Sequence, residues 1–329
     1  TPRSSSAASD VYKRQGFNSI GIASSGGAGR VTAEWMINGH INEDLFSVDI
    51  KRFQQFHSSK KFIMERVTET LGDLYGMHWP YKQHKTSRNQ ITLPYHEELK
   101  KLGACFGSSG GFERPMWYSL NGAKAEYEYS FGYQNWYPSA EYETKNTRKN
   151  VGLFELTPFS KFDVAGENVH DELQKLCTAN IKDVEGRSTY TQMLNEDGGI
   201  ETDVTITCLT KNHFRIIGPA ATREHDKFHI KKYLSEKINF KDVTEDFACL
   251  GLYGPNTRKL LSNISDDDFS NEGIKFSHGK KVNIDGIDVW AQRLSYVGEI
   301  GFELYVKIED SKKLFLTIVN EGKNHNLSL

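Results

Sequence analysis

STYTQMLNEDGGIETDVTITCL, residues 188–209, carries the clearest fold signal in the chain. Two runs rich in Thr, Tyr, Val and Ile flank the polar turn Asn195–Gly199, a pattern typical of a β-hairpin. Side chains alternate along the second run, so that Glu201, Asp203 and Thr205 share one side of the strand and the apolar residues share the other. A period of two around a glycine turn predicts antiparallel sheet with one polar face.

The same kind of pattern extends through the rest of the chain after Val151. A second hairpin is expected over residues 281–298, turning at Asp285-Gly286. Further strands are expected near residues 154–166, 213–219, 247–255 and 301–306, and helices near 167–177, 221–238, 256–265 and 309–322. Helices alternating with antiparallel hairpins predict an α+β fold of antiparallel sheets with packed helices.

The part before Val151 gives weaker signals. Ile63, Val67, Leu71 and Leu74 recur at helical spacing and predict a helix. A short helix followed by an extended segment is expected over residues 93–118. The tyrosine-rich stretch 125–143 has no period and yields no prediction.

Near the start, an apolar segment leads into SSGGAG, and a helix with a glycine C-cap at Gly39 follows. We read this as a strand, a glycine turn and a helix. Backbone amides at Gly26, Gly27 and Gly29 can then approach an anion or a cofactor. The alternative is a tight turn that needs positive φ. It is not a dinucleotide fingerprint, because the third glycine of GxGxxG falls on Thr32.

Composition excludes several classes of partner. The 329 residues include 41 basic and 43 acidic side chains, so the net charge of -2 offers no field for nucleic acid or anionic lipid. No run approaches the ~20 apolar residues of a membrane span. Four cysteines without a CxxC pair indicate a reducing compartment, the cytoplasm or, in a eukaryote, the mitochondrial matrix.

Two short motifs are interpreted as structural. Residues 107–111 match GxSxG, but Pro115 is poor context for the helix that must follow a nucleophile. His225 and His229 lie one helical turn apart, yet a zinc site needs further ligands. Their segment is charged throughout, so we expect a solvated helix face and no metal site.

Two carboxylates are candidates for ligand binding. Asp203 stands on the polar side of its strand, where it can orient an N–H-bearing ligand or serve as an edge-strand charge that deters aggregation. Glu299 lies between Gly298 and Gly301, with Tyr296 beside it. A carboxylate there can pair with neighbouring N–H donors, as on a pterin edge, or belong to a polar turn.

Taken together, these segments resemble the dimethylglycine and sarcosine dehydrogenase family of flavoenzymes. Residues 16–53 resemble the end of its FAD domain, whose last helix approaches the flavin. Residues 93–118 resemble its central segment and the join that follows. Residues 151–176, 194–206 and 294–306 resemble its folate-binding domain, which is shared with the aminomethyltransferase of glycine cleavage.

The resemblance assigns roles to residues. Asp203 falls on the aspartate near the reactive nitrogens of tetrahydrofolate, Glu299 on the glutamate that contacts the pterin, and Tyr296 on the neighbouring tyrosine. Val297 departs from the family, which usually has threonine there. Because GGIETDVTI keeps the aspartate that some dimethylglycine enzymes replace by glutamate, the chain looks closer to sarcosine dehydrogenases.

The resemblance also implies a division of the chain. Residues 16–47 would end the FAD-binding α/β domain, 48–104 form a central linking domain, and 105–329 form a C-terminally truncated folate domain. The chain would therefore be an internal fragment, inactive alone. Residues 5–15 resemble a translated sequencing adapter, and residues 1–15 are therefore expected to lie outside the fold.

The implied activity is FAD-dependent demethylation of sarcosine or dimethylglycine, with the one-carbon unit passed to tetrahydrofolate. Electrons would go to oxygen or to an electron-transfer flavoprotein. Two alternatives stay open. One is a non-redox folate-dependent aminomethyltransferase. The other is a non-catalytic relative like the pyruvate dehydrogenase phosphatase regulatory subunit.

Overall fold

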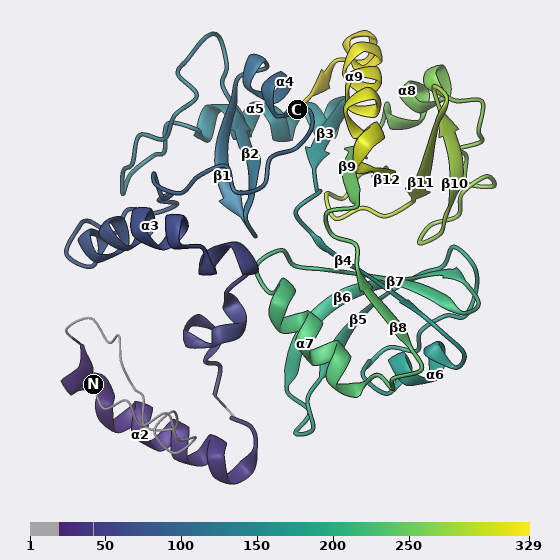
Figure 1. Cartoon of the computed structure of the whole chain (residues 1–329). Helices are drawn as coiled ribbons and strands as arrows, with labels where there is room; N and C mark the ends of the chain where they lie inside the picture. Colours follow the sequence, from purple (N-terminus) through teal and green to yellow (C-terminus); the bar gives the residue numbers. More distant parts are fainter. Residues whose placement is uncertain (1–19, 42) are drawn as a thin grey trace.

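The computed structural model describes residues 20–41 and 43–329, so the stretch read as adapter-derived lies outside the described residues. Two sheets, antiparallel apart from one short edge strand and each with its own helices, form the larger part of the chain (Figure 1). The helices are α2 (Gly21–Asn38), α3 (Lys60–Asp73), α4 (His96–Lys101), α5 (Tyr137–Lys149), α6 (Val169–Gln174), α7 (Arg223–Tyr233), α8 (Thr257–Ile264) and α9 (Ser311–Gly322), with short 3-10 turns η1 (Phe46–Val48), η2 (Ile50–Arg52), η3 (Gln55–Ser58), η4 (Ile308–Asp310) and η5 (Lys323–His325).

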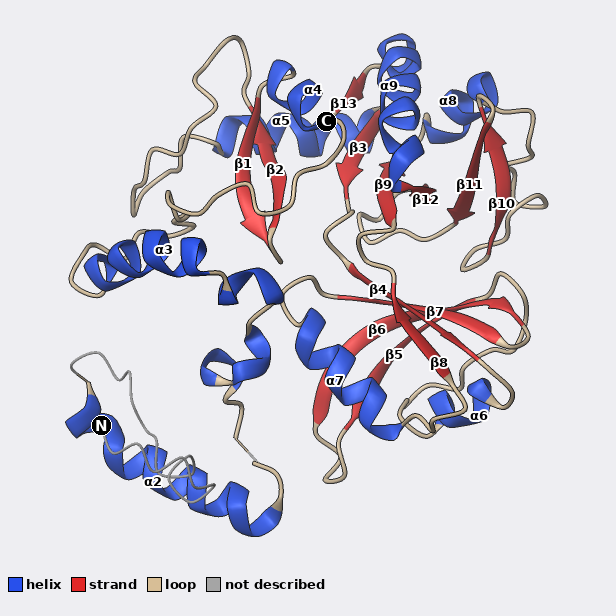
Figure 2. Ribbon diagram, in the orientation of Figure 1, coloured by secondary structure: helices blue, strands red, loops and turns tan. Residues whose placement is uncertain are grey.

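The strands fall into a hairpin and two sheets (Figure 2). The hairpin is β1 (Ala104–Ser109) with β2 (Phe112–Tyr118). The six-stranded sheet has the order β10 (Gly279–Ile284), β11 (Ile287–Gln292), β12 (Gly301–Lys307), β9 (Phe247–Tyr253), β3 (Val151–Glu155) and β13 (Leu327–Ser328). The five-stranded sheet has the order β5 (Ser188–Leu194), β6 (Ile200–Thr210), β7 (His213–Gly218), β4 (Ser160–Ala165) and β8 (Asn239–Asp242).

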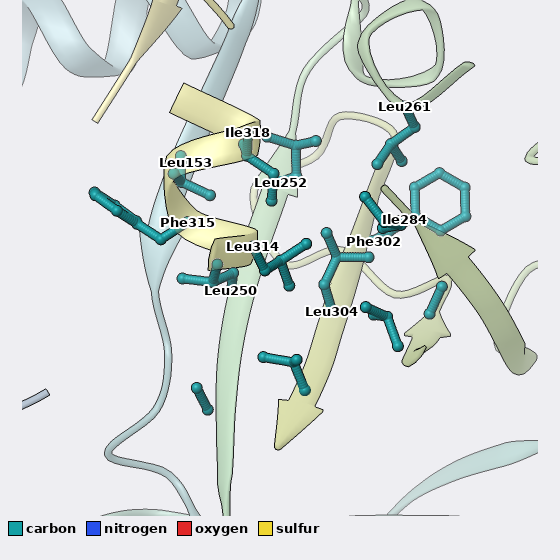
Figure 3. Packing of buried hydrophobic residues seen from close by; sticks show 14 of the residues in the cluster. Leu153, Leu250, Leu252, Leu261, Ile284, Phe302, Leu304, Leu314, Phe315 and Ile318 are labelled. Atoms are coloured by element: carbon teal, nitrogen blue, oxygen red, sulfur yellow. The ribbon is translucent and has the colours of Figure 1, made fainter. Parts of the chain in front are cut away.

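The six-stranded sheet packs against α8 and α9. Leu314, Phe315 and Ile318 of α9 lie over Leu250 and its neighbours on the sheet (Figure 3). Their spacing of three and four residues puts them on one helix face, which explains why this helix was predictable. Burying each such side chain stabilises the fold by about 1.5–3 kcal/mol relative to leaving it in water.

The five-stranded sheet has a separate core, made with α6 and α7. Val204 and Ile206 of β6 belong to it, together with Phe162, Phe214 and Ile230. The alternation predicted for β6 is confirmed, since Asp203 is exposed while Val204 and Ile206 are buried. The expected α+β class is therefore confirmed.

Both predicted hairpins are present. β5 and β6 pair with Gln192 opposite Asp203, and Gly198 takes a φ of 80° in the turn. In the second hairpin, Asp285 and Gly286 have φ of 51° and 78°, the two-residue geometry that Asp-Gly favours.

The single strand expected over residues 154–166 is wrong. β3 ends at Glu155 and β4 begins at Ser160, and the two strands belong to different sheets. Pro158 lies in the turn between them and has no N–H to donate to a ladder. The chain crosses here from one sheet to the other.

The strand and glycine turn expected near Gly26 are also wrong. Gly26, Gly27 and Gly29 lie inside α2, which runs without a break from Gly21. The reason is steric, since a proline-free run of small residues contains nothing that prevents helical backbone. The predicted C-cap is confirmed, because Gly39 has a φ of 77° and donates to the Trp35 carbonyl over 2.9 Å.

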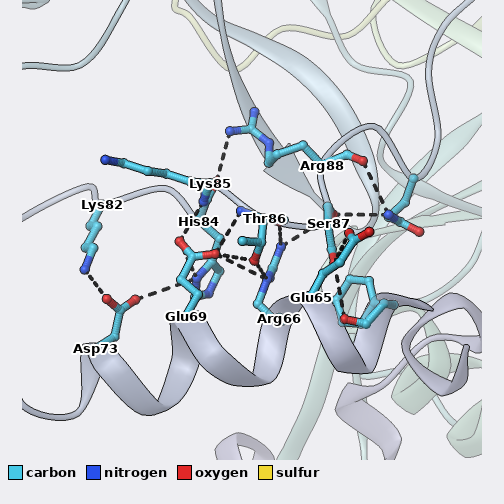
Figure 4. Close-up of polar contacts among 12 residues, drawn as sticks. Glu65, Arg66, Glu69, Asp73, Lys82, His84, Lys85, Thr86, Ser87 and Arg88 are labelled. Atoms are coloured by element: carbon cyan, nitrogen blue, oxygen red, sulfur yellow. Dashed lines mark hydrogen bonds and ion pairs between the residues drawn. The ribbon is translucent and has the colours of Figure 1, made fainter. Parts of the chain in front are cut away.

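Helix α3 forms where expected, but it packs with the opposite face. Ile63, Val67, Leu71 and Leu74 are all exposed. The polar side of the helix instead holds the segment 82–88 (Figure 4). Among the described residues, no helix is both long and apolar enough to cross a bilayer.

Candidate functional site

Asp203 lies on the exposed side of β6, beside a tyrosine from the neighbouring strand. The hydroxyl of Tyr190 donates to Oδ2 of Asp203 over 2.8 Å. This bond to the carboxylate raises the pKa of Tyr190, because an ionised phenol would face a negative charge. Tyr190 is therefore a fixed donor, and Asp203 keeps Oδ1 for another partner.

Tyr296 reaches the same face from the other sheet. It lies in the loop between β11 and β12, and its hydroxyl is 3.4 Å from Oγ1 of Thr205. Thr205 follows Asp203 by two residues on β6 and faces Tyr190 in the register of the hairpin. The two tyrosines thus lie on one polar face, and Tyr296 is 71% exposed.

Glu299, three residues further along this loop, is held by an arginine. Nη1 of Arg148, in the last turn of α5, donates to Oε1 of Glu299 over 3.0 Å and to the Val297 carbonyl over 3.2 Å. Tyr296 therefore contacts the face of β6 that carries Asp203, whereas Glu299 lies on the same loop as Tyr296 but is paired with α5.

The loop continues into a buried polar cluster. Gly301 leaves no room for a side chain, since a Cβ there would be 1.9 Å from the Tyr253 ring. Glu303, two residues further along, accepts a hydrogen bond of 2.6 Å from the Tyr305 hydroxyl. Burial raises the pKa of its carboxyl. This packing fixes the start of β12 and, with it, one end of the loop.

Sequence reasoning placed Asp203, Tyr296 and Glu299 but missed Tyr190 and Arg148. Tyr190 could have been found from the hairpin register, because it lies diagonally across from Asp203. Arg148 gave no such signal, since 151 positions separate it from Glu299. The glycines of α2 lie far along the chain from this face. Their contact with a flavin stays a prediction.

The GxSxG motif is a turn and not a nucleophile elbow. Gly110 and Gly111 have φ of 56° and 86° and join β1 directly to β2. A Cβ on Gly110 would lie 2.8 Å from the Ala220 carbonyl, and one on Gly111 would lie 2.5 Å from the Phe56 ring. The glycines serve close packing at the hairpin tip.

The expected solvated face of α7 is wrong. Asp226 and His229 are buried, and Asp226 accepts from the Thr222 and Thr202 hydroxyls over 2.7 and 3.1 Å. His225 lies between two carboxylates, 3.0 Å from Glu201 and 3.1 Å from Asp226, and the bond to Asp226 raises its pKa. Polar side chains face the sheet here because the sheet offers hydroxyl and carboxylate partners.

One cluster in the described residues has metal-ligand composition, namely Glu69, Asp73 and His84. The carboxylates of this cluster already accept hydrogen bonds from nearby groups of the protein. The ammonium of Lys82 lies 2.5 Å from Asp73, and Glu69 accepts from the backbone N–H groups of residues 85 and 86 (Figure 4). Burial alone would raise the pKa of Glu69, but the hydroxyl of Thr86 and these two N–H groups outweigh it and lower the pKa to about 2. The cluster fastens α3 to the following segment.

Two concave regions lie away from the polar face. One, of about 890 Å³, lies beside α8, α9 and the β10–β11 turn; the other, of about 340 Å³, lies beside α4. Two of the acidic side chains in the larger one already have partners, since Glu321 accepts from Asn263 and Asp285 from Thr317. Because neither region contains the predicted folate residues, we keep the open face as the candidate site.

Family comparisons match almost the whole described chain. The GCVT N-terminal domain model matches residues 95–329, and the FAD dependent oxidoreductase central domain model matches residues 38–92. The chain belongs to the GCVT family. The chain joins this domain to an FAD dependent oxidoreductase central domain, and its homologues include sarcosine dehydrogenases, dimethylglycine dehydrogenases and a 4-methylaminobutanoate oxidase. The expected boundaries at 47/48 and 104/105 stay predictions.

Relatives of this GCVT-family chain include an amine oxidase, a phosphatase regulatory subunit and a sarcosine dehydrogenase. The 4-methylaminobutanoate oxidase (formaldehyde-forming) of Paenarthrobacter nicotinovorans is 37% identical over 98% of this chain and 39% of its own length. The mouse mitochondrial pyruvate dehydrogenase phosphatase regulatory subunit is 30% identical over 95% of this chain and 36% of its own. Human mitochondrial sarcosine dehydrogenase is 28% identical over 95% of this chain and 38% of its own. The chain thus spans under two fifths of each relative.

A solved structure supports the fold. The glycine cleavage aminomethyltransferase T of Bartonella henselae superposes with a TM-score of 0.58 at 23% identity, over 73% of this chain and 59% of that one. The aminomethyltransferase fold expected from the sequence is confirmed by this likeness.

Proposed function

We propose that this chain is the folate-binding part of an FAD-dependent enzyme that demethylates an N-methylated amino acid and transfers the one-carbon unit to tetrahydrofolate. The observation that carries the proposal is the shared polar face of Asp203, Tyr190 and Tyr296 in a GCVT-family domain preceded by an oxidoreductase central domain. Sarcosine, dimethylglycine and 4-methylaminobutanoate are the substrates to test first.

The carboxylates and the aromatic ring on this face suit a reduced pterin. Its N–H groups need acceptors, which Asp203 and Glu299 supply, and its flat ring can stack on an exposed aromatic such as Tyr296. Asp203, oriented by Tyr190, would hold the ligand amine where the one-carbon unit arrives and accept a proton during capture. Glu299 and Tyr296 would fix the ring.

The flavin supplies oxidation of the N-methyl group when it is bound. Because Gly26 and Gly27 lie within α2, their amides donate inside the helix, and any contact of these glycines with the flavin would be made by the helix surface and not by a glycine turn. Oxygen or an electron-transfer flavoprotein would accept the electrons, and the four free cysteines suit a reducing compartment such as the cytoplasm or mitochondrial matrix.

A second candidate follows from the relative described as formaldehyde-forming, which is 37% identical. In that reading the one-carbon unit leaves as formaldehyde and the folate face is not used. The regulatory relative raises a third possibility, a protein without turnover. The matched oxidoreductase central domain favours a flavoenzyme over a non-redox aminomethyltransferase.

One experiment separates these candidates. The full-length protein is incubated with each methylated amine, with and without tetrahydrofolate, and flavin reduction, methylene-tetrahydrofolate and formaldehyde are measured. Folate-dependent methylene-tetrahydrofolate supports the proposal. A formaldehyde yield that is the same with and without tetrahydrofolate supports the formaldehyde-forming oxidase. Absence of flavin reduction with every amine supports the regulatory protein without turnover.

A further inference from the structure

The loop of residues 295–300 carries both Tyr296 and Glu299, so its shape sets where the two groups stand. Its far end is fixed, because the N–H of Gly254 donates to the Ile300 carbonyl over 2.8 Å before β12 begins. Gly298 has a φ of 75°, a conformation that few other residues adopt. The middle of the loop needs a contact from elsewhere to hold this bend.

Arg148 supplies that contact. Its Nη1 donates to the Val297 carbonyl over 3.2 Å and to Oε1 of Glu299 over 3.0 Å, one residue on either side of Gly298. A Cβ on Gly298 would lie 3.0 Å from the same nitrogen. The guanidinium therefore fits into the bend, and the glycine makes room for it.

The base of this arginine is rigid. At the same end of α5, the amide of Asn146 donates to the Asn326 carbonyl over 2.7 Å, and Thr147 is buried. A Cβ on Gly254 would lie 2.6 Å from the Thr147 carbonyl, so the helix end packs directly on the chain after β9. A cation in the last turn of a helix also interacts favourably with its dipole.

We propose that Arg148 is a positioning residue, which holds residues 295–300 so that Glu299 and Tyr296 meet tetrahydrofolate in one fixed arrangement. This inference rests on the proposed function. Among the described residues, the contacts of Glu299 use Oε1, which leaves Oε2 to accept an N–H from the ligand. Arg148 shapes the site without touching the ligand itself.

The pair contributes little to global stability, because Arg148 is 57% exposed and exposed ion pairs are weak. Its effect is on the loop. Replacing Arg148 should leave the fold intact and loosen one binding element, which permits a clean test.

The test uses the full-length protein and tetrahydrofolate, with Arg148→Gln, Arg148→Lys and the control Lys149→Gln, which removes an exposed charge from the same helix turn. We expect Arg148→Gln to weaken tetrahydrofolate binding about tenfold, the scale of one charge-assisted hydrogen bond. The KM for tetrahydrofolate should rise while flavin reduction by the amine is unchanged. Amides of residues 295–300 should exchange faster, and Arg148→Lys should recover part of the affinity.

A double variant gives a second measure. If Arg148 acts through Glu299, then Arg148→Gln combined with Glu299→Gln should weaken binding less than the two separate losses multiplied. Independent, multiplying effects would contradict the inference, as would equal weakening by Lys149→Gln or normal affinity in Arg148→Gln. If the unmodified protein itself fails to bind tetrahydrofolate, the proposed function is wrong, and this inference with it.

Discussion

Tyr190 and Asp203 form a diagonal hydrogen bond of 2.8 Å across the β5–β6 hairpin. In the register of the two strands, Asp203 faces Gln192 and Tyr190 faces Thr205, so the bond spans one step of the ladder. Both side chains are exposed, and their bond stabilises the fold little. The bond orients the carboxylate: Tyr190 stays protonated and holds Oδ2 of Asp203, which leaves Oδ1 for a ligand.

Tyr190→Phe removes this donor and keeps the ring. The free energy of unfolding should change by less than about 0.5 kcal/mol, as for other exposed substitutions. The ratio of methylene-tetrahydrofolate to formaldehyde should fall several-fold in the full-length enzyme, because Asp203 is no longer oriented. Tyr133→Phe, at a tyrosine 85% exposed in another loop, is the matched control. An unchanged ratio in Tyr190→Phe would mean that Asp203 needs no orienting partner.

Asp203→Asn keeps size and removes charge. Flavin reduction by the amine should be nearly unchanged, since we place oxidation at a different site. Capture should weaken by about 1–3 kcal/mol, the scale of a hydrogen bond to a charged group, and free formaldehyde should rise. Asp288→Asn, an exposed aspartate on β11, controls for loss of charge. If the product ratio at saturating tetrahydrofolate equals that of the unmodified enzyme, Asp203 is an edge-strand charge only.

The parts of the fold that the sequence predicted share one property, which is that local pattern and tertiary packing agree. In β6 the alternation around Asp203 matches the buried and exposed sides, and Asp285-Gly286 supplies the φ values its turn needs. Helix α9 has its apolar stripe against the sheet. In these elements the residues that form the local structure are also the residues that are buried.

The failures occur where tertiary contacts override local pattern. Glycines near Gly26 suggested a turn, yet nothing in the run prevents a helix. The apolar stripe of α3 suggested a buried face, yet Arg66 and Glu69 on its polar side find partners in the following segment (Figure 4). The charges of α7 suggested a solvated face, yet Asp226 is buried with hydroxyl partners.

The candidate site was predictable only in part, for the same reason. Asp203, Tyr296 and Glu299 lie in glycine-bounded motifs that resemble a family. Arg148 lies on α5, which buries only Ser139 and Thr147 and so has no apolar stripe to detect. The sequence signals of α5 are the proline near its start and the basic residues in its last turn. These signals indicate a helix but do not indicate a binding site.

Arg88→Ala tests the join between the central segment and the β1–β2 hairpin. Arg88 makes a bidentate pair with Glu113, whose side chain is 3% exposed and also accepts from the Asn89 N–H over 2.9 Å. Removing the arginine leaves a buried carboxylate unpaired, which should cost about 3–5 kcal/mol of stability. Urea denaturation measures it, and Lys85→Ala, three residues away and exposed, should change little. A loss below about 1 kcal/mol would show that water reaches Glu113.

Glu143, on α5, gives a prediction for pH. Burial raises the pKa of its carboxyl to about 7, although the N–H of Tyr118 donates to it over 2.9 Å and favours the charged form. The folded protein therefore holds this proton more tightly than the unfolded chain, whose carboxyl has the ordinary value near 4.5. The stability this group contributes is fully present below pH 4.5 and is lost as the pH rises through about 7.

Glu143→Gln stays neutral at every pH and still accepts from Tyr118. It should match the unmodified protein near pH 4.5 and exceed it at pH 8, by on the order of 1–2 kcal/mol given that the carboxyl is only partly buried. Urea denaturation at a series of pH values between these limits measures the difference. Glu141→Gln, two residues earlier and exposed beside Lys145, is the control and should show no such trend. An advantage of Glu143→Gln that does not grow with pH would mean that the carboxyl is already ionised in the folded protein, and that α5 meets β2 through a charged contact.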